Sequence, residues 1–369
     1  MPSFPLPFAS PHSAGAAGVE PRQAFSRVDR SQHERTPEAM TTQPREVANG
    51  RGSREIGSPA VVRRPTVAIL FPGQGSQYPG MADPWASHPA GSSILQEASD
   101  AMGLDVVAGC HDDDALATTA FVQPALLACD VAAFHVLEAE GVAPLGVAGH
   151  SLGQFAALVA ADVVSLADAL DLVVIRGAAM HRAGKERPGA MTALLGVGSG
   201  DVSSLCEEVR GDDELVVANE NSPAQVVISG SVAAIERAES LAKERRIRAV
   251  RLPVAGAFHS PLMEPARAAI DERIDATGFS APRCPVAENV AGALVSDPDE
   301  LRSLLKRHVV SPVRWESSIL ALGEVGAGSF LEAGPGDVLT KLMKRIVPEA
   351  AARAIGSPEE ARVAASGTP

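Results

Sequence analysis

The fold of this 369-residue chain is most constrained by one short run, Gly149-His150-Ser151-Leu152-Gly153. Residues 144–148 before it are short, apolar and compatible with a strand, and residues 155–161 after it are Ala-rich and indicate a buried helix. A Gly-x-Ser-x-Gly run between a strand and a helix is typical of a nucleophile elbow, in which the serine occupies a sharp, strained turn. The alternative is an ordinary tight turn, because the bare motif recurs in Gly-rich chains.

A serine at such a turn lies at the N-terminus of the following helix. There the free backbone N–H groups and the helix dipole stabilise negative charge. This environment suits a serine alkoxide, and it also suits the oxyanion that forms when the serine attacks a carbonyl. We therefore expect Ser151 to be a nucleophile.

Composition narrows the classes of function. Apolar residues make up 46% of the chain and aromatic residues 4%, so Ala, Val and Leu must fill the core. The formal net charge of −13 argues against a nucleic-acid partner, for which a basic patch is expected. No apolar run reaches the roughly 18–20 residues of a membrane span. The cysteines lack Cys-x-x-Cys spacing, so we expect no metal site and free thiols in a reducing cytoplasm; they are Cys110, Cys129, Cys206 and Cys284.

Residues 1–64 are rich in Pro, Ser, Arg, Gln and Gly and are expected to be a disordered leader without a secretory signal. Met40 is an alternative start. From Thr66 onward strands alternate with helices, which predicts an α/β fold with a mainly parallel sheet. Pro124 is expected in the first turn of its helix. The elements expected here are strands at 66–71, 144–148 and 329–332 and helices at 124–137, 165–176 and 338–346.

The pattern changes between residues 187 and 254, where a β-α-β-α-β order is expected. Its predicted elements are strands at 191–197, 225–230 and 248–254 and helices at 201–209 and 232–245. We therefore expect a small inserted subdomain at 187–254, within a large subdomain formed by residues 65–186 and 255–347. Residues 348–369 are expected to be a frayed C-terminal tail.

A nucleophilic serine needs a general base, and position removes most of the nine histidines. Those in the leader, in polar turns or inside helical patterns are set aside: His12, His33, His88, His111, His135 and His181. His150 is expected to point away from the serine across the turn. His259 follows a strand at a strand-to-helix corner, where the catalytic loops of α/β folds lie. His308 follows a basic helix and could equally be a partner of that helix's C-terminus.

Six segments, in order along residues 65–347, resemble the malonyl-CoA:acyl carrier protein transacylases, which include the acyltransferases of fatty acid and polyketide synthesis. They are Phe71-Pro72-Gly73-Gln74-Gly75-Ser76-Gln77, Gly149-His150-Ser151-Leu152-Gly153, Arg176-Gly177 with Met180, Ala257-Phe258-His259-Ser260, Ser311-Pro312-Val313-Arg314-Trp315 and Glu332-Ala333-Gly334-Pro335-Gly336. The resemblance implies a large α/β-hydrolase-like subdomain with a parallel sheet and an inserted small ferredoxin-like subdomain. This agrees with the change of pattern at residue 187.

The resemblance also implies site residues. Ser151 and His259 would form a dyad, with the backbone N–H groups of Gln74 and Leu152 as the oxyanion hole. The backbone carbonyl of His308 would orient His259, at a position where the family usually has glutamine. The pocket would further contain Gln123, Phe258, Asn219 and Asn221. Gln154 stands where the family usually has glutamate.

Arg176 would hold the malonyl carboxylate. A guanidinium binds a carboxylate through two parallel hydrogen bonds, and a plain esterase pocket has no use for a buried positive charge. The alternative is a helix-end arginine paired with Asp or Glu at the surface. In the polyketide enzymes Phe-His accompanies malonyl and Ser-His accompanies methylmalonyl, so Phe258 favours malonyl.

The sequence thus predicts a discrete, trans-acting, monomeric acyltransferase that follows a ping-pong order. Malonyl-CoA acylates Ser151, and the phosphopantetheine thiol of an acyl carrier protein then takes the malonyl group. No bound cofactor and no metal is expected, and the pathway, fatty acid or polyketide, stays open. The alternatives are an editing hydrolase on the same scaffold, transfer of an unusual acyl group, and a non-catalytic docking subunit.

Carrier proteins are typically acidic, so docking on this acidic chain requires a local basic patch. The candidates lie on two predicted helices: Arg302, Lys306, Arg307, Lys341, Lys344 and Arg345. The alternative is that these residues are ordinary solvated helix faces.

Overall fold

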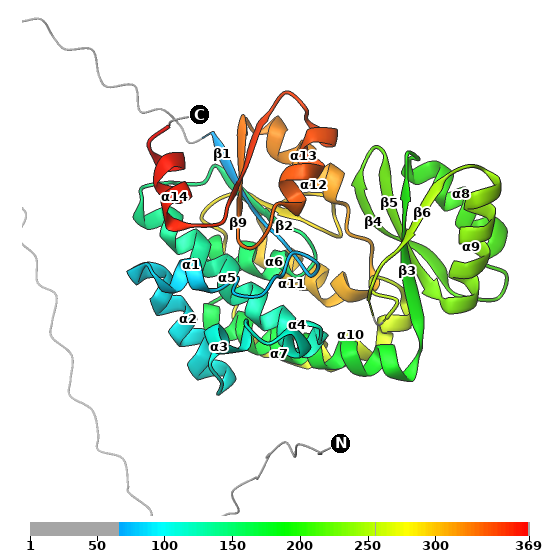
Figure 1. The fold of residues 1–369 in the computed structure, drawn as a ribbon, viewed down its shortest axis with the longest axis horizontal. Helices are drawn as coiled ribbons and strands as arrows, with labels where there is room; N and C mark the ends of the chain where they lie inside the picture. The colour runs from blue at the N-terminus through cyan, green and yellow to red at the C-terminus, as the bar shows by residue number, and fades with distance from the viewer. Residues whose placement is uncertain (1–65, 255, 368–369) are drawn as a thin grey trace, which may run out of the picture. The chain divides into compact units, whose positions relative to one another are not determined.

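The structure, a computed structural model, describes residues 66–254 and 256–367 (Figure 1). The predicted leader at 1–64 lies outside the described residues. A six-stranded sheet has the order β10-β9-β1-β2-β7-β8. Its strands are β1 (Val67–Phe71), β2 (Gly146–Gly149), β7 (Val286–Glu288), β8 (Ala293–Val295), β9 (Ser329–Ala333) and β10 (Ala351–Ile355). All neighbours from β10 to β7 are parallel, and β8 is antiparallel to β7, which confirms the predicted α/β class.

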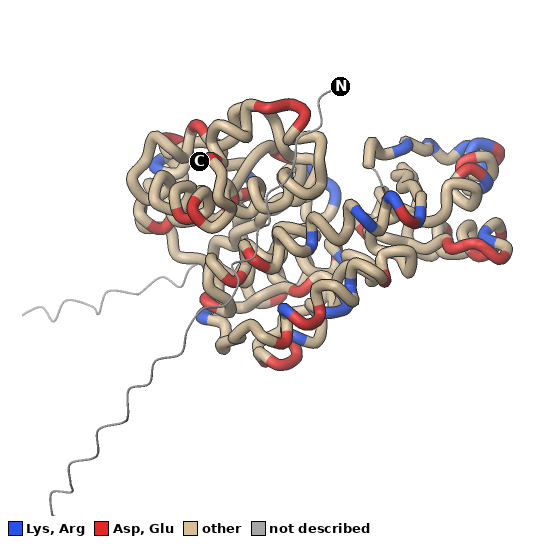
Figure 2. Tube along the Cα trace, turned by 90° about the horizontal axis from the view of Figure 1, so that it is seen from below, with Lys and Arg blue, Asp and Glu red and all other residues tan. Residues whose placement is uncertain are grey.

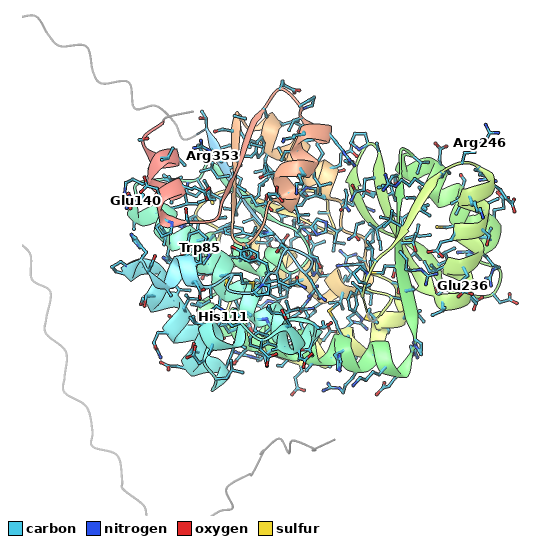
Figure 3. The ribbon with its side chains drawn as sticks, in the orientation of Figure 1. Trp85, His111, Glu140, Glu236, Arg246 and Arg353 are labelled. Carbon is cyan, nitrogen blue, oxygen red and sulfur yellow. The ribbon has the colours of Figure 1, made fainter. Side chains whose placement is uncertain are left out.

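Helices cover both faces of this sheet, as its continuous apolar strands require. In β1, Ile69 and Phe71 pack on one face, and Ala68 and Leu70 pack on the other. The second face is covered by α12 (Trp315–Glu324) and α13 (Val338–Ile346) (Figure 1). The first face and its surroundings hold α1 (Asp83–Ala86), α2 (Pro89–Met102), α3 (Val106–Gly109), α4 (Asp113–Leu116), α5 (Thr119–Ala139), α6 (Gly153–Ala160), α7 (Leu166–Glu186), α10 (Glu264–Ala276), α11 (Pro298–Arg307) and α14 (Pro358–Ala365). Side chains fill the space between these layers (Figure 3).

Helix α5 lies at the centre of the first face. It begins at Thr119, five residues before the predicted start, so Pro124 lies inside the helix and not at its entry. Proline has no N–H for the i→i−4 bond, and here packing on α2 and α7 outweighs that loss. Among the described residues α5 alone is long and apolar enough to cross a membrane, but 83% of its apolar window is buried inside the fold. It is therefore the core helix of the large sheet.

A second, antiparallel sheet has the order β4-β5-β3-β6. Its strands are β3 (Gly189–Leu195), β4 (Leu215–Ser222), β5 (Gln225–Ser231) and β6 (Arg248–Arg251), with α8 (Ser199–Val209) and α9 (Val232–Glu244) on one face. The βαββαβ order is ferredoxin-like, as the resemblance implied. The predicted β-α-β-α-β order was wrong because it lacked β4. That strand ends in polar residues and pairs with β5 through two irregularities in register, so it carries no clean alternation.

Strand β4 of the small sheet is hydrogen-bonded to the segment that precedes α12. The Val313 N–H donates to the Ala218 carbonyl at 2.9 Å, and the Glu220 N–H donates to the Val313 carbonyl at 2.9 Å. This bridge fixes Asn219 beside the segment that enters α12. The far side of the small sheet carries α8 and α9, whose outer surface includes Glu236 and the nearby Arg246 (Figure 3).

The prediction of a frayed tail from residue 348 was wrong. β10 pairs in parallel with β9 along its whole length, and Ile355 is fully buried. Ala361 of α14 is also buried in the core cluster that contains α5. The segment is too Ala-rich to indicate a strand, and pairing with β9 supplies what its propensity lacks.

Candidate active site

Ser151 occupies the turn between β2 and α6 with a φ of 51°, in the left-handed region. The strand and the helix approach so closely that a Cβ on Gly149 would lie 1.9 Å from the carbonyl carbon of Gly153. Only glycine fits there, which accounts for the spacing of the motif. The turn therefore has the strand–turn–helix geometry of the nucleophile elbow that the sequence predicts.

The side chain of His259 meets this serine. Ser151 Oγ and His259 Nε2 lie 2.7 Å apart. His259 Nδ1 lies 3.0 Å from the carbonyl oxygen of His308 and 3.0 Å from that of Ser311. A carbonyl only accepts, so Nδ1 carries the proton and Nε2 is left to accept from the serine hydroxyl. The contribution of Ser311 was not foreseen from the sequence.

Arg176 lies in the middle of α7 and is only 1% exposed. Its Nη1 donates to Gln123 Oε1 at 2.6 Å, and its Nη2 donates to Ser151 Oγ at 3.1 Å. The α5–α7 crossing that brings these groups together requires Gly177, where a Cβ would lie 2.8 Å from the Thr119 carbonyl oxygen. Within the described ranges no carboxylate pairs with Arg176, and its Nε has no partner. The alternative of a surface ion pair is therefore wrong.

The electrostatics of the site follow from burial. Desolvation lowers the pKa of the Arg176 guanidinium to about 9. Burial, and after it the charge of Arg176, lower the pKa of His259 to about 3. The pKa values of His308 and His150 also fall below the usual range, mainly through burial. At neutral pH the three imidazoles are therefore neutral beside one buried guanidinium.

A cavity of about 220 Å³ lies over the dyad, between the two sheets. The candidate site residues predicted from the sequence all line it except His308, whose carbonyl oxygen lies 3.0 Å from His259 Nδ1. Those that line it are Gln74, Gln123, Ser151, Leu152, Arg176, Asn219, Asn221, Phe258 and His259. Much of the rest of the wall is apolar and comes from the small sheet and α13, for example Met191, Val227 and Leu342. Asn219 and Asn221 lie on strand β4.

Gln74 and Leu152 are the two residues expected to form an oxyanion hole. Both line the cavity beside Ser151. Leu152 precedes the first residue of α6. Among residues 66–254 and 256–367 neither backbone N–H donates a hydrogen bond, so both remain able to bind an oxyanion.

His150 lines the same cavity. Its Nε2 lies 2.8 Å from Asn221 Oδ1, and its ring packs edge-on against Trp315 with the centroids 5.4 Å apart. It makes no hydrogen bond to Ser151, as expected, and instead links the elbow to β4.

In the described part of the chain no cluster of His, Cys, Asp or Glu side chains could hold a metal ion. The four cysteines are free thiols.

Asn289 is a neighbour of the elbow that the sequence did not reveal. It directly follows β7, which pairs with β2, and its Oδ1 accepts a hydrogen bond from the Ser151 N–H at 2.8 Å. Polar residues that follow parallel strands meet at one sheet edge. That position is the one sequence signal that could have identified it.

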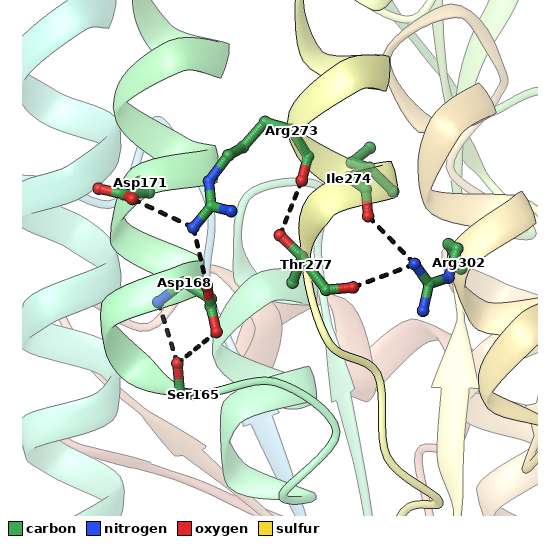
Figure 4. A network of polar contacts seen from close by, with 7 residues as sticks. All are labelled: Ser165, Asp168, Asp171, Arg273, Ile274, Thr277 and Arg302. Carbon is green, nitrogen blue, oxygen red and sulfur yellow. Dashed lines mark hydrogen bonds and ion pairs between the residues drawn. The ribbon is translucent and has the colours of Figure 1, made fainter. Parts of the chain in front are cut away.

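The six candidate docking residues fall into two groups. Arg302 donates to the carbonyls of Ile274 and Thr277 at the end of α10 (Figure 4), and Lys306 pairs with Asp275. These two residues of α11 thus serve internal contacts. On α13, Lys341 pairs with Asp337, and Arg345 donates to Gln225, which lines the cavity. The basic residues of α13 therefore lie nearer the cavity; Figure 2 shows how charges are distributed over the chain.

Comparison with known proteins agrees with this geometry. The family described as "Acyl transferase domain" matches residues 69–362. The malonyl CoA-acyl carrier protein transacylase of Escherichia coli (strain K12) is 40% identical over 296 residues, which cover 79% of this chain and 96% of that protein.

Solved structures give the same result. The malonyl CoA-acyl carrier protein transacylase of Coxiella burnetii superposes with a TM-score of 0.79 at 36% identity, covering 82% of this chain and 97% of that one. A type II PKS acyl-carrier protein in complex with its malonyl-transacylase provides a match with a TM-score of 0.79 at 37% identity, covering 82% of this chain and 99% of that one. These matches confirm the resemblance carried by the six segments.

Proposed function

Because the chain belongs to the acyl transferase domain family, we propose that it transfers a malonyl group from malonyl-CoA to the phosphopantetheine thiol of an acyl carrier protein, in fatty acid or polyketide synthesis. The observation that carries this proposal is Arg176, a buried guanidinium that has no carboxylate partner among the described residues and lies 3.1 Å from the serine hydroxyl. A buried charge of this kind is costly unless an anion balances it. The free carboxylate of a malonyl thioester provides that anion.

In the first half-reaction Ser151 Oγ attacks the thioester carbonyl carbon while His259 Nε2 takes the hydroxyl proton. The carbonyl oxygen becomes an oxyanion that accepts hydrogen bonds from the backbone N–H groups of Gln74 and Leu152. The C–S bond then breaks, the proton on Nε2 passes to the departing CoA thiolate, and malonyl-Ser151 remains. The carbonyls of His308 and Ser311 hold the Nδ1 proton throughout, so no third acid is required.

The second half-reaction reverses these roles. The carrier thiol enters the cavity from which CoA has left and gives its proton to His259 Nε2 as its sulfur attacks the acyl carbon. The ester C–O bond breaks, and the proton on Nε2 returns to Ser151 Oγ. The two substrates use one site in turn, which is a ping-pong order. The mainly apolar wall from the small sheet and α13 suits the pantetheine arm that the two thiols share.

The division of the chain is part of this proposal. A large subdomain from residues 65–186 and 255–347, extended through β10 and α14, would supply the dyad, the oxyanion hole and Arg176. A small subdomain at 187–254 would supply Asn219, Asn221 and the apolar wall. The cavity would then be the seam between them.

Product analysis tests the proposal against an editing hydrolase. The protein is incubated with malonyl-CoA, with and without a phosphopantetheinylated acyl carrier protein, and malonyl-carrier and free malonate are quantified. Transfer predicts malonyl-carrier as the main product and little malonate. Malonate formed at the same rate in both reactions would favour the hydrolase, and a panel of acyl-CoA substrates would reveal transfer of another acyl group.

A further inference from the structure

Asn289 is fully buried, and every hydrogen-bonding position of its side-chain amide is occupied. Nδ2 donates to the Gly149 carbonyl at 2.7 Å and to Gln154 Oε1 at 2.7 Å. Oδ1 accepts from the Ser151 N–H at 2.8 Å and lies 3.3 Å from His308 Nε2. The Ser151 N–H can only donate and the Gly149 carbonyl can only accept, so the orientation of the amide is determined.

The contacts to Gly149 and Ser151 resemble those of a sheet. β7 runs parallel to β2 and ends at Glu288, one residue before Asn289. The amide then accepts from one backbone N–H and donates to one backbone carbonyl two residues apart, as a neighbouring strand would. It thus continues the β2–β7 pairing past the end of β7, across the turn that holds the serine at a φ of 51°. Left-handed backbone in a non-glycine residue persists only where surrounding contacts enforce it.

The contact to His308 concerns the other half of the dyad. Oδ1 accepts, so His308 Nε2 must carry the proton of that neutral ring, and Nδ1 is unprotonated and without a partner among the described residues. The same residue gives its backbone carbonyl to His259 Nδ1. One amide therefore contacts the backbone of the nucleophile and the residue that orients the base.

Asn289 is itself held firmly. Its carbonyl accepts from the Arg314 N–H at 2.9 Å. The turn after it is closed by the Glu288 carboxylate, whose Oε2 accepts from the N–H groups of Val290 and Ala291 at 2.8 Å each. These hydrogen bonds fix the backbone of Asn289 and so hold its side-chain amide in place, as a positioning group requires.

We propose that Asn289 is a positioning residue. Its side-chain amide holds Ser151 in its strained turn and fixes His308, so that Ser151 Oγ and His259 Nε2 stay at hydrogen-bonding distance. Its effect on rate rests on the proposed function, and its effect on the tautomer of His308 does not. Asn289 touches neither acyl group nor thiol in this scheme. It should therefore affect the chemical steps and leave substrate affinity unchanged.

The test compares Asn289→Ala and Asn289→Asp with the parent. Asn289→Ala should lower kcat for malonyl transfer by about 10²-fold, the scale of a small misplacement of reacting groups, while KM for malonyl-CoA stays within about twofold because Arg176 is untouched. Asn289→Asp keeps an acceptor for the Ser151 N–H, and Gln154 can turn its unpaired Nε2 toward the new carboxylate. This variant should recover part of the lost rate, and it also serves if the alanine variant does not fold.

Ser318→Ala is the matched control. Ser318 is buried in the same region, where its hydroxyl lies 3.0 Å from the Arg314 carbonyl oxygen and 3.4 Å from that of Glu288, and it is hydrogen-bonded to neither Ser151 nor His259. Rates are measured well below the unfolding midpoint of every variant. A kcat for Asn289→Ala within about threefold of that for Ser318→Ala would overturn the proposal, as would a rise in KM at constant kcat.

¹⁵N NMR of labelled histidine provides a readout that does not depend on turnover. In the parent, His308 should be the Nε2-protonated tautomer, and in Asn289→Ala this preference should be lost. A parent His308 protonated on Nδ1, or a tautomer unchanged in Asn289→Ala, would contradict the proposed contact. If the parent formed no acyl-enzyme, the proposed function would fail, and this NMR comparison would still decide the role of Asn289.

Discussion

Ser151 and His259 both adopt left-handed backbone conformations, with φ values of 51° and 57°, and their side chains meet at 2.7 Å. In the described ranges only two other non-glycine residues do so, Asp162 and Arg246. Such conformations cost roughly 1–3 kcal/mol each and persist where the surroundings enforce them. We infer that the fold holds nucleophile and base in reacting geometry before a substrate binds.

The low pKa of His259 makes a prediction for the pH dependence of acylation. The base must be neutral, and burial together with Arg176 places its pKa at about 3. We therefore expect kcat/KM for malonyl-CoA to be flat from about pH 8 down to about pH 5 and to fall only below that. An acid limb near pH 6.5, the ordinary value for histidine, would contradict the structure.

The pH dependence of kcat should differ from that of kcat/KM. The charge of Arg176 is the second cause of the low His259 pKa. A bound malonyl carboxylate would neutralise that charge, so the acid limb of kcat should lie at higher pH than that of kcat/KM.

The same pKa shift makes folding stability depend on pH. Because His259 binds a proton more tightly in the unfolded chain than in the folded one, its contribution to stability is fully present above pH 6.5 and is lost as the pH falls toward about 3.

Arg176→Ala should remove the preference for a carboxylated acyl group. Losing one partner of a buried charge pair costs about 2–5 kcal/mol, so kcat/KM for malonyl-CoA should fall roughly 30- to 4,000-fold. Acetyl-CoA, which has no carboxylate, should react no more slowly than with the parent. Arg182→Ala, an exposed arginine on the same helix, is the control. Equal losses for the two acyl-CoA substrates would show that Arg176 does not bind the carboxylate.

Phe258→Ser should relax the selectivity for malonyl over methylmalonyl. Phe258 lines the cavity next to His259 and is 6% exposed. Removing its ring opens space beside C2 of the acyl group, and one methyl group in such a pocket is worth about 10- to 200-fold. We expect the ratio of the two kcat/KM values to move by at least about tenfold toward methylmalonyl-CoA. An unchanged ratio would mean that other residues contact C2.

Charge reversal on α13 tests carrier docking. The double variant Lys341→Glu with Lys344→Glu should raise KM for the acyl carrier protein about tenfold, with acylation by malonyl-CoA unchanged. Arg345 is left intact because it donates to Gln225 at the cavity. Lys243→Glu with Arg246→Glu, on and after α9, changes the net charge equally at the far edge of the small sheet. A similar rise in KM for both double variants would point to net charge and not to a docking surface.

The fold could be predicted where local pattern and tertiary role agree. The apolar run 67–71 became a buried central strand, and Ser165, a good N-cap by type, caps α7 by accepting from the Asp168 N–H. Strands β4 and β10 were not predicted, because neither segment has the residue pattern of a strand on its own. The polar end of β4 is stabilised by β5 and Val313, and the alanines of β10 by β9. Pro124 gave a false helix start because packing of α5 outweighed a local rule.

The site could be predicted where spacing carries the chemistry. Ser151 can be recognised in the sequence by the glycines on either side of it, which the tight turn requires. Arg176 is followed by Gly177, which permits the close crossing of α5 and α7. No comparable glycine pattern indicates the roles of Asn289 and the Ser311 carbonyl. Their roles arise only when β7 pairs with β2 and when the chain turns past His308. The local patterns of a single sequence do not reveal which strands become neighbours.

Peptide mapping by mass spectrometry after brief exposure to malonyl-CoA tests the central claim most directly. The account predicts one malonyl group, on Ser151, that disappears as malonyl-carrier forms when acyl carrier protein is added, and no adduct in Ser151→Ala. Transfer to the carrier that persists in Ser151→Ala, or a malonyl group found on another residue, would contradict it.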